Sequence, residues 1–298
     1  MQLADFKDVA SQYKVIFFDA FGVLKNYEGL LPGIENTFGW LKENNKEFYV
    51  LTNDASRSPQ ELAESYYRQG FYDITPDRII SSGMLAREYL DLKVNHGTVA
   101  YLGTESSAHY LETTGLKTLP ISQLDLADVA DINALVLLDD EGFDWNTDLN
   151  KTVNLLRKRN IPVIVANTDE TYPVSKTRIA IAIGAVAEMI ETIVGKQFIR
   201  FGKPDAQLFM FAYERLDNVV PRGLETPQDG HISKRDILMV GDTLRTDILG
   251  GNKFGLDTVL VLSGNTQAQD AEIRIRSTGI IPTYICESVV ISENTIAP

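Results

Sequence analysis

The sequence predicts an α/β protein of about two domains that is built on a parallel sheet. Short apolar runs alternate with segments of helical period along the chain, a pattern typical of a parallel sheet covered by helices. Several runs are apolar on both faces, as expected of buried parallel strands. The length of 298 residues favours about two domains rather than one core.

The elements follow from these patterns in chain order. A helix with Ile34, Phe38 and Leu41 on one face is predicted after an entry at Pro32 and Gly33. A second repeats that spacing at Leu149, Val153 and Leu156, and the helix "AVAEMIETIV" is expected to end at Gly195. The predicted strands are Lys14–Asp19, Glu47–Thr52, Thr98–Leu102, Ala134–Leu138, Pro162–Val165, Phe198–Phe201, Ile237–Gly241 and Thr258–Leu262.

Composition excludes several classes of function. The formal net charge of -13 argues against a nucleic-acid groove and against binding to an acidic membrane surface. Cys286 is the only cysteine, so an intramolecular disulfide is impossible and a zinc-thiolate cluster is not expected. The start "MQLADFKDVA" lacks the apolar run of a secretory signal, and no stretch resembles a membrane helix. We therefore expect a cytoplasmic protein with no nucleic-acid or membrane partner.

Polar residues follow four of the predicted strands, where ligands bind in open parallel sheets. Each has an ordinary structural explanation when it is considered alone, because turn residues and loop caps are common at such positions. Their joint occurrence in this order is harder to explain in that way. The residues are Asp19; Thr52, Asn53 and Asp54; Lys203; and Asp242 with Asp247.

The four segments resemble the four motifs of the haloacid dehalogenase superfamily. "FFDAFGVL" is similar to the first motif except at its third position, and "LTNDASRS", "FGKPD" and "GDTLRTD" are similar to the other three. "ANTDETYP" and "IGAVAEMIETIVGK" narrow the resemblance to the phosphatases similar to NagD and 4-nitrophenylphosphatase. This resemblance implies a Rossmann-like core, a doubly wound parallel sheet, with an inserted α/β cap domain.

Spacing along the chain gives the expected domain limits. Only 13 positions separate Asp19 from Pro32, which suffices for a small flap, whereas 150 positions separate Asn53 from Lys203. The longer interval contains its own strand and helix patterns and can hold a domain. We predict a core of 1–93 and 197–298 and a cap of 94–196, with a second domain that takes no part in catalysis as the alternative.

The resemblance implies a set of roles at the strand ends. Asp19 is the implied nucleophile, which forms an aspartyl-phosphate that water hydrolyses. Mg²⁺ is the implied cofactor, held by Asp19, the backbone carbonyl of Phe21 and Asp242, with Asp247 beside the site. Lys203, Thr52 and the backbone N–H of Asn53 are the implied contacts of the phosphoryl oxygens.

Phe21 is the departure from the family pattern, because the phosphatases have a second aspartate there that acts as general acid and base. Phenylalanine cannot transfer a proton, so a contribution of about 10² to 10⁴ in rate should be missing from that position. Three interpretations compete. In the first, the chain is a phosphohydrolase whose substrates have good leaving groups, or one in which another acid replaces the missing aspartate; Asp54 is the first candidate, and Tyr27 and Glu28 are weaker ones. In the second, the chain is a relative that binds phosphorylated ligands without hydrolysing them. In the third, it is a dehalogenase.

The implied cap contains the candidates for substrate contact. Asn167, Asp169 and Tyr172 lie in "VANTDETYPVSK", which resembles the specificity loop of the family, although ordinary turn chemistry explains them as well. Asp139 and Asp140 follow another predicted strand, and we expect them to be structural or solvated. The implied substrate is a small phosphorylated metabolite such as a sugar phosphate, and the resemblance allows a homodimer through the cap.

Overall fold

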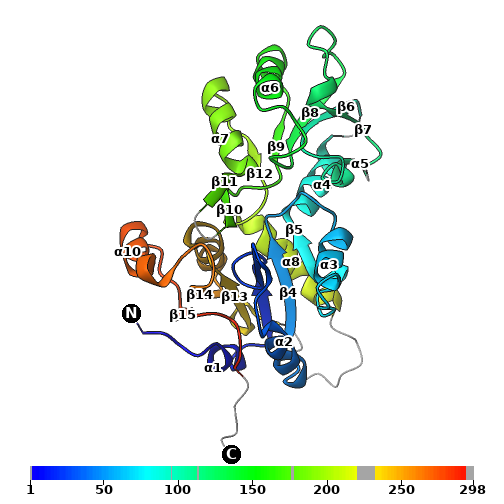
Figure 1. The fold of residues 1–298 in the computed structure, drawn as a ribbon. Coiled ribbons are helices and arrows are strands. Elements are labelled where there is room, and N and C mark those ends of the chain that lie inside the picture. The colour runs from blue at the N-terminus through cyan, green and yellow to red at the C-terminus, as the bar shows by residue number, and fades with distance from the viewer. Residues whose placement is uncertain (1, 95, 113, 176–177, 220–231, 293–298) are drawn as a thin grey trace, which may run out of the picture. The chain divides into compact units, whose positions relative to one another are not determined.

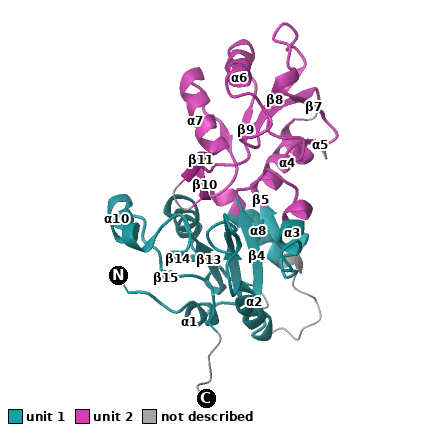
Figure 2. Ribbon diagram, in the orientation of Figure 1, with its two compact units in different colours: residues 1–52, 63–80, 209–298 teal, residues 53–62, 81–208 magenta. Residues whose placement is uncertain are grey.

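A computed structural model of the chain describes residues 2–94, 96–112, 114–175, 178–219 and 232–292. These residues form two compact units (Figure 2). Unit 1 comprises residues 1–52, 63–80 and 209–298, and unit 2 comprises residues 53–62 and 81–208. Among the described residues, no helix is long and apolar enough to cross a membrane.

Unit 1 contains a six-stranded sheet in the order β15-β14-β13-β1-β4-β5 (Figure 1). The pairs β1–β4, β1–β13, β13–β14 and β14–β15 are parallel. Chain order runs outward from β1 in one direction through β4 and β5, and in the other through β13, β14 and β15. The strands are β1 (Val15–Phe18), β4 (Glu47–Thr52), β5 (Ile79–Ser81), β13 (Ile237–Gly241), β14 (Asp257–Val261) and β15 (Tyr284–Cys286).

Aromatic side chains fill much of the core of unit 1. Phe38 lies on α2 (Ile34–Glu43), and its ring centroid is 5.6 Å from that of Phe18 on β1 and 4.8 Å from that of Phe48 on β4. Gly33 immediately precedes α2 and has a φ of 84°, which is accessible to glycine at little cost. The other helices with residues in this unit are α1 (Phe6–Ser11), α9 (Leu249–Phe254) and α10 (Ala268–Thr278), together with most of α3 (Pro59–Tyr67) and α8 (Ala206–Val219).

Unit 2 contains a five-stranded sheet in the order β12-β9-β8-β6-β7, with all neighbours parallel. Its buried core joins apolar side chains of the sheet to those of α6 and α7. An antiparallel hairpin, β10–β11, precedes α7. The strands are β6 (Thr98–Leu102), β7 (Lys117–Pro120), β8 (Ile132–Leu137), β9 (Val163–Val165), β10 (Thr171–Ser175), β11 (Arg178–Ile181) and β12 (Ile199–Arg200). The helices are α4 (Ser82–Lys93), α5 (His109–Glu112), α6 (Thr147–Lys158) and α7 (Ile183–Val194).

The α/β class and all eight predicted strands are confirmed, with strand ends within two residues of the prediction. The predicted helix end at Gly195 is confirmed by its left-handed φ of 65°. The segment between Asp19 and Pro32, for which the spacing predicts a small flap, contains a hairpin of β2 (Lys25–Asn26) and β3 (Gly29–Leu30). The interval 94–196 lies within unit 2, and its role as a cap stays a prediction.

Candidate active site

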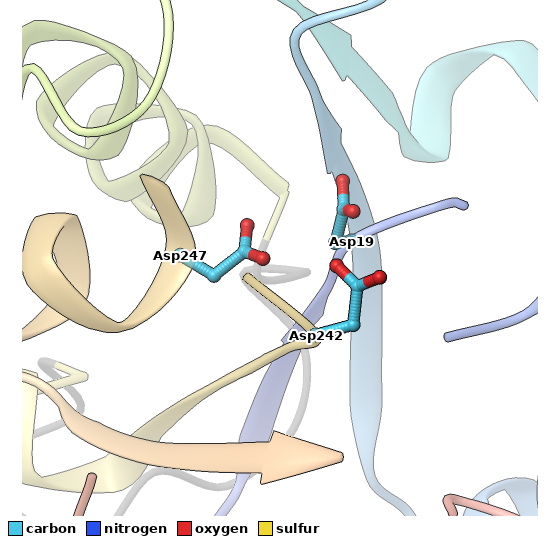
Figure 3. Close-up of side chains that lie close together, drawn as sticks. All are labelled: Asp19, Asp242 and Asp247. Atoms are coloured by element: carbon cyan, nitrogen blue, oxygen red, sulfur yellow. The ribbon is translucent and has the colours of Figure 1, made fainter. Parts of the chain in front are cut away.

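Three carboxylates lie close together in unit 1 (Figure 3). Asp19 follows β1, Asp242 follows β13, and Asp247 lies in a π-helical turn, Leu244–Ile248, just beyond it. One carboxylate oxygen from each residue can be chosen so that all three atoms lie within 4.8 Å of one another. Asp19 is half-buried, whereas Asp242 and Asp247 are buried.

The strand order explains why these side chains meet. The chain reverses its direction across the sheet between the neighbouring strands β1 and β13, and such a switch point is where open parallel sheets bind ligands. The N–H of Asp19 donates to the carbonyl oxygen of Val240 at 2.8 Å and holds the two strand ends in register. Gly241 lets Asp247 approach, because a Cβ there would lie 2.1 Å from the Cβ of Asp247.

The Asp242 carboxylate is held by the neighbouring Thr243 and by the loop that follows β14. The backbone N–H of Asn265 donates to its Oδ2 at 2.6 Å, and the hydroxyl of Thr243 donates to its Oδ1 at 2.9 Å. Gly22 and Gly264 pack against Oδ2 of Asp242, and a Cβ at either glycine would lie 2.0 Å from this oxygen. Side chains larger than hydrogen are therefore excluded at both positions.

Electrostatic repulsion accompanies this packing. Burial raises the pKa of Asp242 well above its usual value, and the negative charges of Asp247 and Asp19 raise it further. The hydrogen bonds from Asn265 and Thr243 act in the opposite direction. A divalent cation among these oxygens would offset the repulsion, and an all-oxygen donor set is the kind that Mg²⁺ prefers. The residues present therefore fit this ion.

A second group of predicted residues meets in unit 2. The Asn53 carboxamide accepts from the backbone N–H of Lys203 at 2.7 Å and donates to the carbonyl oxygen of Lys203 at 3.0 Å. It also donates to Oδ1 of Asp169 at 2.9 Å and to Oγ1 of Thr168 at 3.0 Å. Asn53 and Lys203 are each only 2% exposed.

The remaining predicted residues have the following places. Thr52 is buried at the end of β4 in unit 1, and half-buried Phe21 forms a backbone bridge to Lys25. In unit 2, Oδ1 of Asp54 accepts from the N–H and hydroxyl of Ser56, and Oδ1 of Asn167 accepts from the N–H of Asp169. Tyr172 lies in strand β10, so its assignment to a loop was wrong; the extended segment pairs with β11.

Some residues around these groups were not predicted from the sequence. They are Gly22, Thr243, Gly264 and Asn265 around Asp242, and Thr168 and Gly202 around Asn53. A signal was available for Gly264 and Asn265, because "SGNT" directly follows a predicted strand, and Gly22 and Thr243 lie within the quoted segments "FFDAFGVL" and "GDTLRTD". Thr168 and Gly202 lie within the quoted segments "ANTDETYP" and "FGKPD", but nothing in those segments shows that they contact Asn53.

An acidic pair follows β8 in unit 2. Burial raises the pKa of Asp139 to about 6, and the neighbouring charge of Asp140 contributes. Burial also raises the pKa of Asp140, against the effect of the Tyr172 hydroxyl, which donates to its Oδ2 at 3.0 Å. Both acids are half-buried, so a structural role fits them and full solvation does not.

We expect Asp139→Asn to stabilise the protein at pH 8 and not at pH 4. The folded chain holds the Asp139 proton more tightly than the unfolded chain, so this carboxylate destabilises the fold once the pH rises through about 6. Solvent screening limits the gain in unfolding free energy to about 1 kcal/mol. Denaturation at both pH values measures it, with exposed Asp128→Asn of the same unit as the control. An equal gain at both pH values would contradict the explanation.

Comparisons with known proteins agree with the motifs. A model described as haloacid dehalogenase-like hydrolase matches residues 16–117, and a HAD-hydrolase-like model matches residues 200–290. The chain is 31% identical to a dihydroxyacetone phosphatase of Corynebacterium glutamicum (strain R), over 91% of this chain and 87% of that protein.

Solved structures extend the likeness to the whole fold. A protein of Cytophaga hutchinsonii, described as a possible sugar phosphatase of the HAD superfamily, is 63% identical with a TM-score of 0.91, over 98% of this chain and 100% of that chain. A glycerol phosphate phosphatase of Mycobacterium tuberculosis, solved in complex with magnesium, is 25% identical with a TM-score of 0.74, over 94% and 77% of the two chains. Because sequence models, a relative above 30% identity and solved folds agree, the chain belongs to the haloacid dehalogenase-like hydrolases.

Proposed function

We propose that the protein is a Mg²⁺-dependent phosphohydrolase that acts on a small phosphorylated metabolite through an aspartyl-phosphate on Asp19. The observation that carries the proposal is the group of three carboxylates, Asp19, Asp242 and Asp247, at the switch point of the unit 1 sheet. Relatives described as phosphatases of dihydroxyacetone phosphate and of glycerol phosphate support the reaction class. The magnesium complex of one of them supports the metal.

The residues of unit 1 have distinct roles in this proposal. Asp19, Asp242 and the backbone carbonyl of Phe21 would hold Mg²⁺. Asp247 would orient a water ligand of the ion or the Lys203 side chain. When bound, the ion neutralises charge on the phosphoryl oxygens and lowers the repulsion between them and the nucleophile. An oxygen of Asp19 forms the new bond to phosphorus while the ester bond breaks, and water then releases inorganic phosphate and regenerates the carboxylate.

Residues of the other motifs complete the proposal. The ammonium of Lys203, the hydroxyl of Thr52 and the backbone N–H of Asn53 would bind the phosphoryl oxygens and stabilise the transition state. Asn167, Asp169 and Tyr172 would contact the alcohol portion of the substrate. Their positions after β9 and in β10 support this assignment, because a single segment carries all three.

Phe21 restricts the expected substrates. Without an acid at this position, the leaving group departs as an anion unless another group protonates it, so aryl and acyl phosphates should react faster than alkyl phosphates. Asp54 is the proposed substitute acid where alkyl esters do react. The competing function is a protein that binds a phosphorylated ligand without turnover, and Phe21 is the observation that favours it.

A panel of phosphate esters distinguishes these functions. We expect the protein to release phosphate from aryl and acyl phosphates with Mg²⁺ and to lose this activity when the ion is removed by a chelator. Binding of phosphate esters with no release from any of them would identify a binding protein. Chloride release from 2-haloacids without Mg²⁺ would identify a dehalogenase instead.

We expect Gly264→Ala to weaken Mg²⁺ binding by about tenfold or more. The added methyl would lie 2.0 Å from Oδ2 of buried Asp242 and 2.6 Å from Cα of Gly22, so a metal ligand or its supporting backbone must move. Calorimetric titration with Mg²⁺ measures the effect without reference to activity. Gly39→Ala is the matched control, because a Cβ at this position in α2 meets nothing within 4 Å. Unchanged Mg²⁺ affinity in Gly264→Ala would remove Asp242 from the metal site.

A further inference from the structure

The Asn53 side chain connects segments of unit 2 that lie far apart in the sequence. Its carboxamide bonds to both backbone groups of Lys203, which lies 150 positions later in the chain, in the manner of a strand partner. It also bonds to Oδ1 of Asp169 in the loop after β9. Thr168 completes the connection, because its hydroxyl donates to the carbonyl oxygen of Lys203 at 2.6 Å.

The packing around the carboxamide requires this arrangement. Gly202 has a φ of +125°, and a Cβ there would lie 2.7 Å from Oδ1 of Asn53. The loop that carries Asp169 is held from its other side, because the N–H of Gly184 at the start of α7 donates to the carbonyl oxygen of Asp169 at 3.0 Å. Both segments joined by Asn53 therefore have defined backbone positions.

The hydrogen-bond pattern demands asparagine. The N–H of Lys203 requires an acceptor, whereas the carbonyl oxygen of Lys203 and the carboxylate of Asp169 require donors. A carboxamide supplies one acceptor and two N–H donors within one short side chain, whereas a hydroxyl has only a single O–H to donate. A carboxylate at position 53 would face two other oxygens in a buried place, and alanine would leave buried backbone groups of Lys203 without this partner.

We propose that Asn53 is a positioning residue that couples the phosphate-binding lysine to the loop that contacts the alcohol portion of the substrate. This inference rests on the proposed roles of Lys203 and Asp169. The positioning role belongs to the side chain of Asn53 and is separate from the proposed contact of its backbone N–H with the phosphoryl oxygens. Because one carboxamide fixes both segments, a change at position 53 alters phosphate affinity and substrate choice together, whereas a change at Asp169 alters substrate choice alone.

The test compares Asn53→Ala and Asn53→Asp with Asp169→Ala. Calorimetry measures the affinity for inorganic phosphate with Mg²⁺ present, and kinetics measures the kcat/KM ratio for two aryl phosphates with different ring substituents. We expect Asn53→Ala to lose about tenfold in phosphate affinity and to change the ratio, with a larger loss in Asn53→Asp. Asp169→Ala should change the ratio at parental phosphate affinity, and adding it to Asn53→Ala should change the ratio little further.

A merely structural role for Asn53 gives a different result. It would lower the melting temperature and reduce turnover of both esters equally, with no coupling to Asp169, and that result overturns the proposal. If Asn53→Ala does not fold, Thr168→Val removes the neighbouring hydrogen bond to Lys203 and should weaken phosphate binding in the same direction; unchanged binding again overturns the proposal. If the parent protein binds phosphate but hydrolyses no phosphate ester, the proposed function is wrong. The phosphate affinities of the Asn53 and Thr168 variants would still test whether the Asn53 side chain positions Lys203.

Discussion

The Asp19→Asn variant is expected to release phosphate from aryl phosphates at least about 10⁴-fold more slowly than the parent protein. The amide has nearly the shape of the carboxylate, but its neutral oxygen is a poor nucleophile and cannot form an acyl-phosphate. The change also removes one of three negative charges from a site where the atoms lie within 4.8 Å of one another. Steady-state release of phosphate, followed with Mg²⁺ present, measures the loss.

Two controls make this result specific. Exposed Asp77→Asn in the same unit should retain parental turnover, which excludes a general effect of losing an acid. When both proteins are measured without Mg²⁺, the melting temperature of Asp19→Asn should be at least that of the parent, because a negative charge that repels Asp242 has been removed. Turnover that survives in a folded Asp19→Asn protein would show that another group, or water itself, attacks phosphorus.

Phe21→Asp is expected to increase kcat/KM for alkyl phosphates by about 10² to 10⁴ while changing that for aryl phosphates much less. An alkoxide is a far more basic leaving group than a phenolate, so only the alkyl esters depend strongly on a proton donor. The side chain of Phe21 is half-buried in the turn after β1, and the backbone carbonyl proposed for the metal is kept by the substitution. The alkyl-to-aryl ratio is therefore the quantity to measure.

Phe21→Asn is the matched control for this gain. Asparagine has nearly the shape of aspartate but cannot act as an acid. Phe21→Asn should therefore leave the ratio of kcat/KM for alkyl and aryl phosphates at the parental value. Equal gains in both variants would mean that removing the aromatic ring, rather than supplying a proton, opened the site. A parent protein already active on alkyl esters would instead indicate a substitute acid, and Asp54→Asn would then be expected to abolish that activity.

The central strands could be predicted from the sequence because burial on both faces makes them continuous apolar runs. The missed strands β5, β7 and β15 all lie at sheet edges. β5 and β15 have only three residues each, and β7 is half-exposed and ends in Pro120, so none produces a long apolar run. Tyr172 was placed in a loop for a related reason, since the short hairpin β10–β11 has exposed positions along both strands.

The carboxylates of the candidate site could also be predicted, because the ends of parallel strands converge at one edge of a sheet. Contacts between distant segments could not. Nothing in the local sequence shows that Gly264 packs against Asp242 or that the Asn53 side chain meets Thr168. Such contacts depend on how loops after different strands fold over one another, and loop residues do not follow a periodic pattern.

The strand order has a consequence for synthesis on the ribosome. β1 lies in the middle of its sheet and pairs with β4 along one side and with β13 along the other. β4 ends at Thr52 and is made soon after β1, but β13 begins only at Ile237, so one edge of β1 stays without its partner for most of translation. Unpaired edges of apolar strands promote association between nascent chains. The nascent protein is therefore expected to depend on shielding by chaperones until β13 emerges.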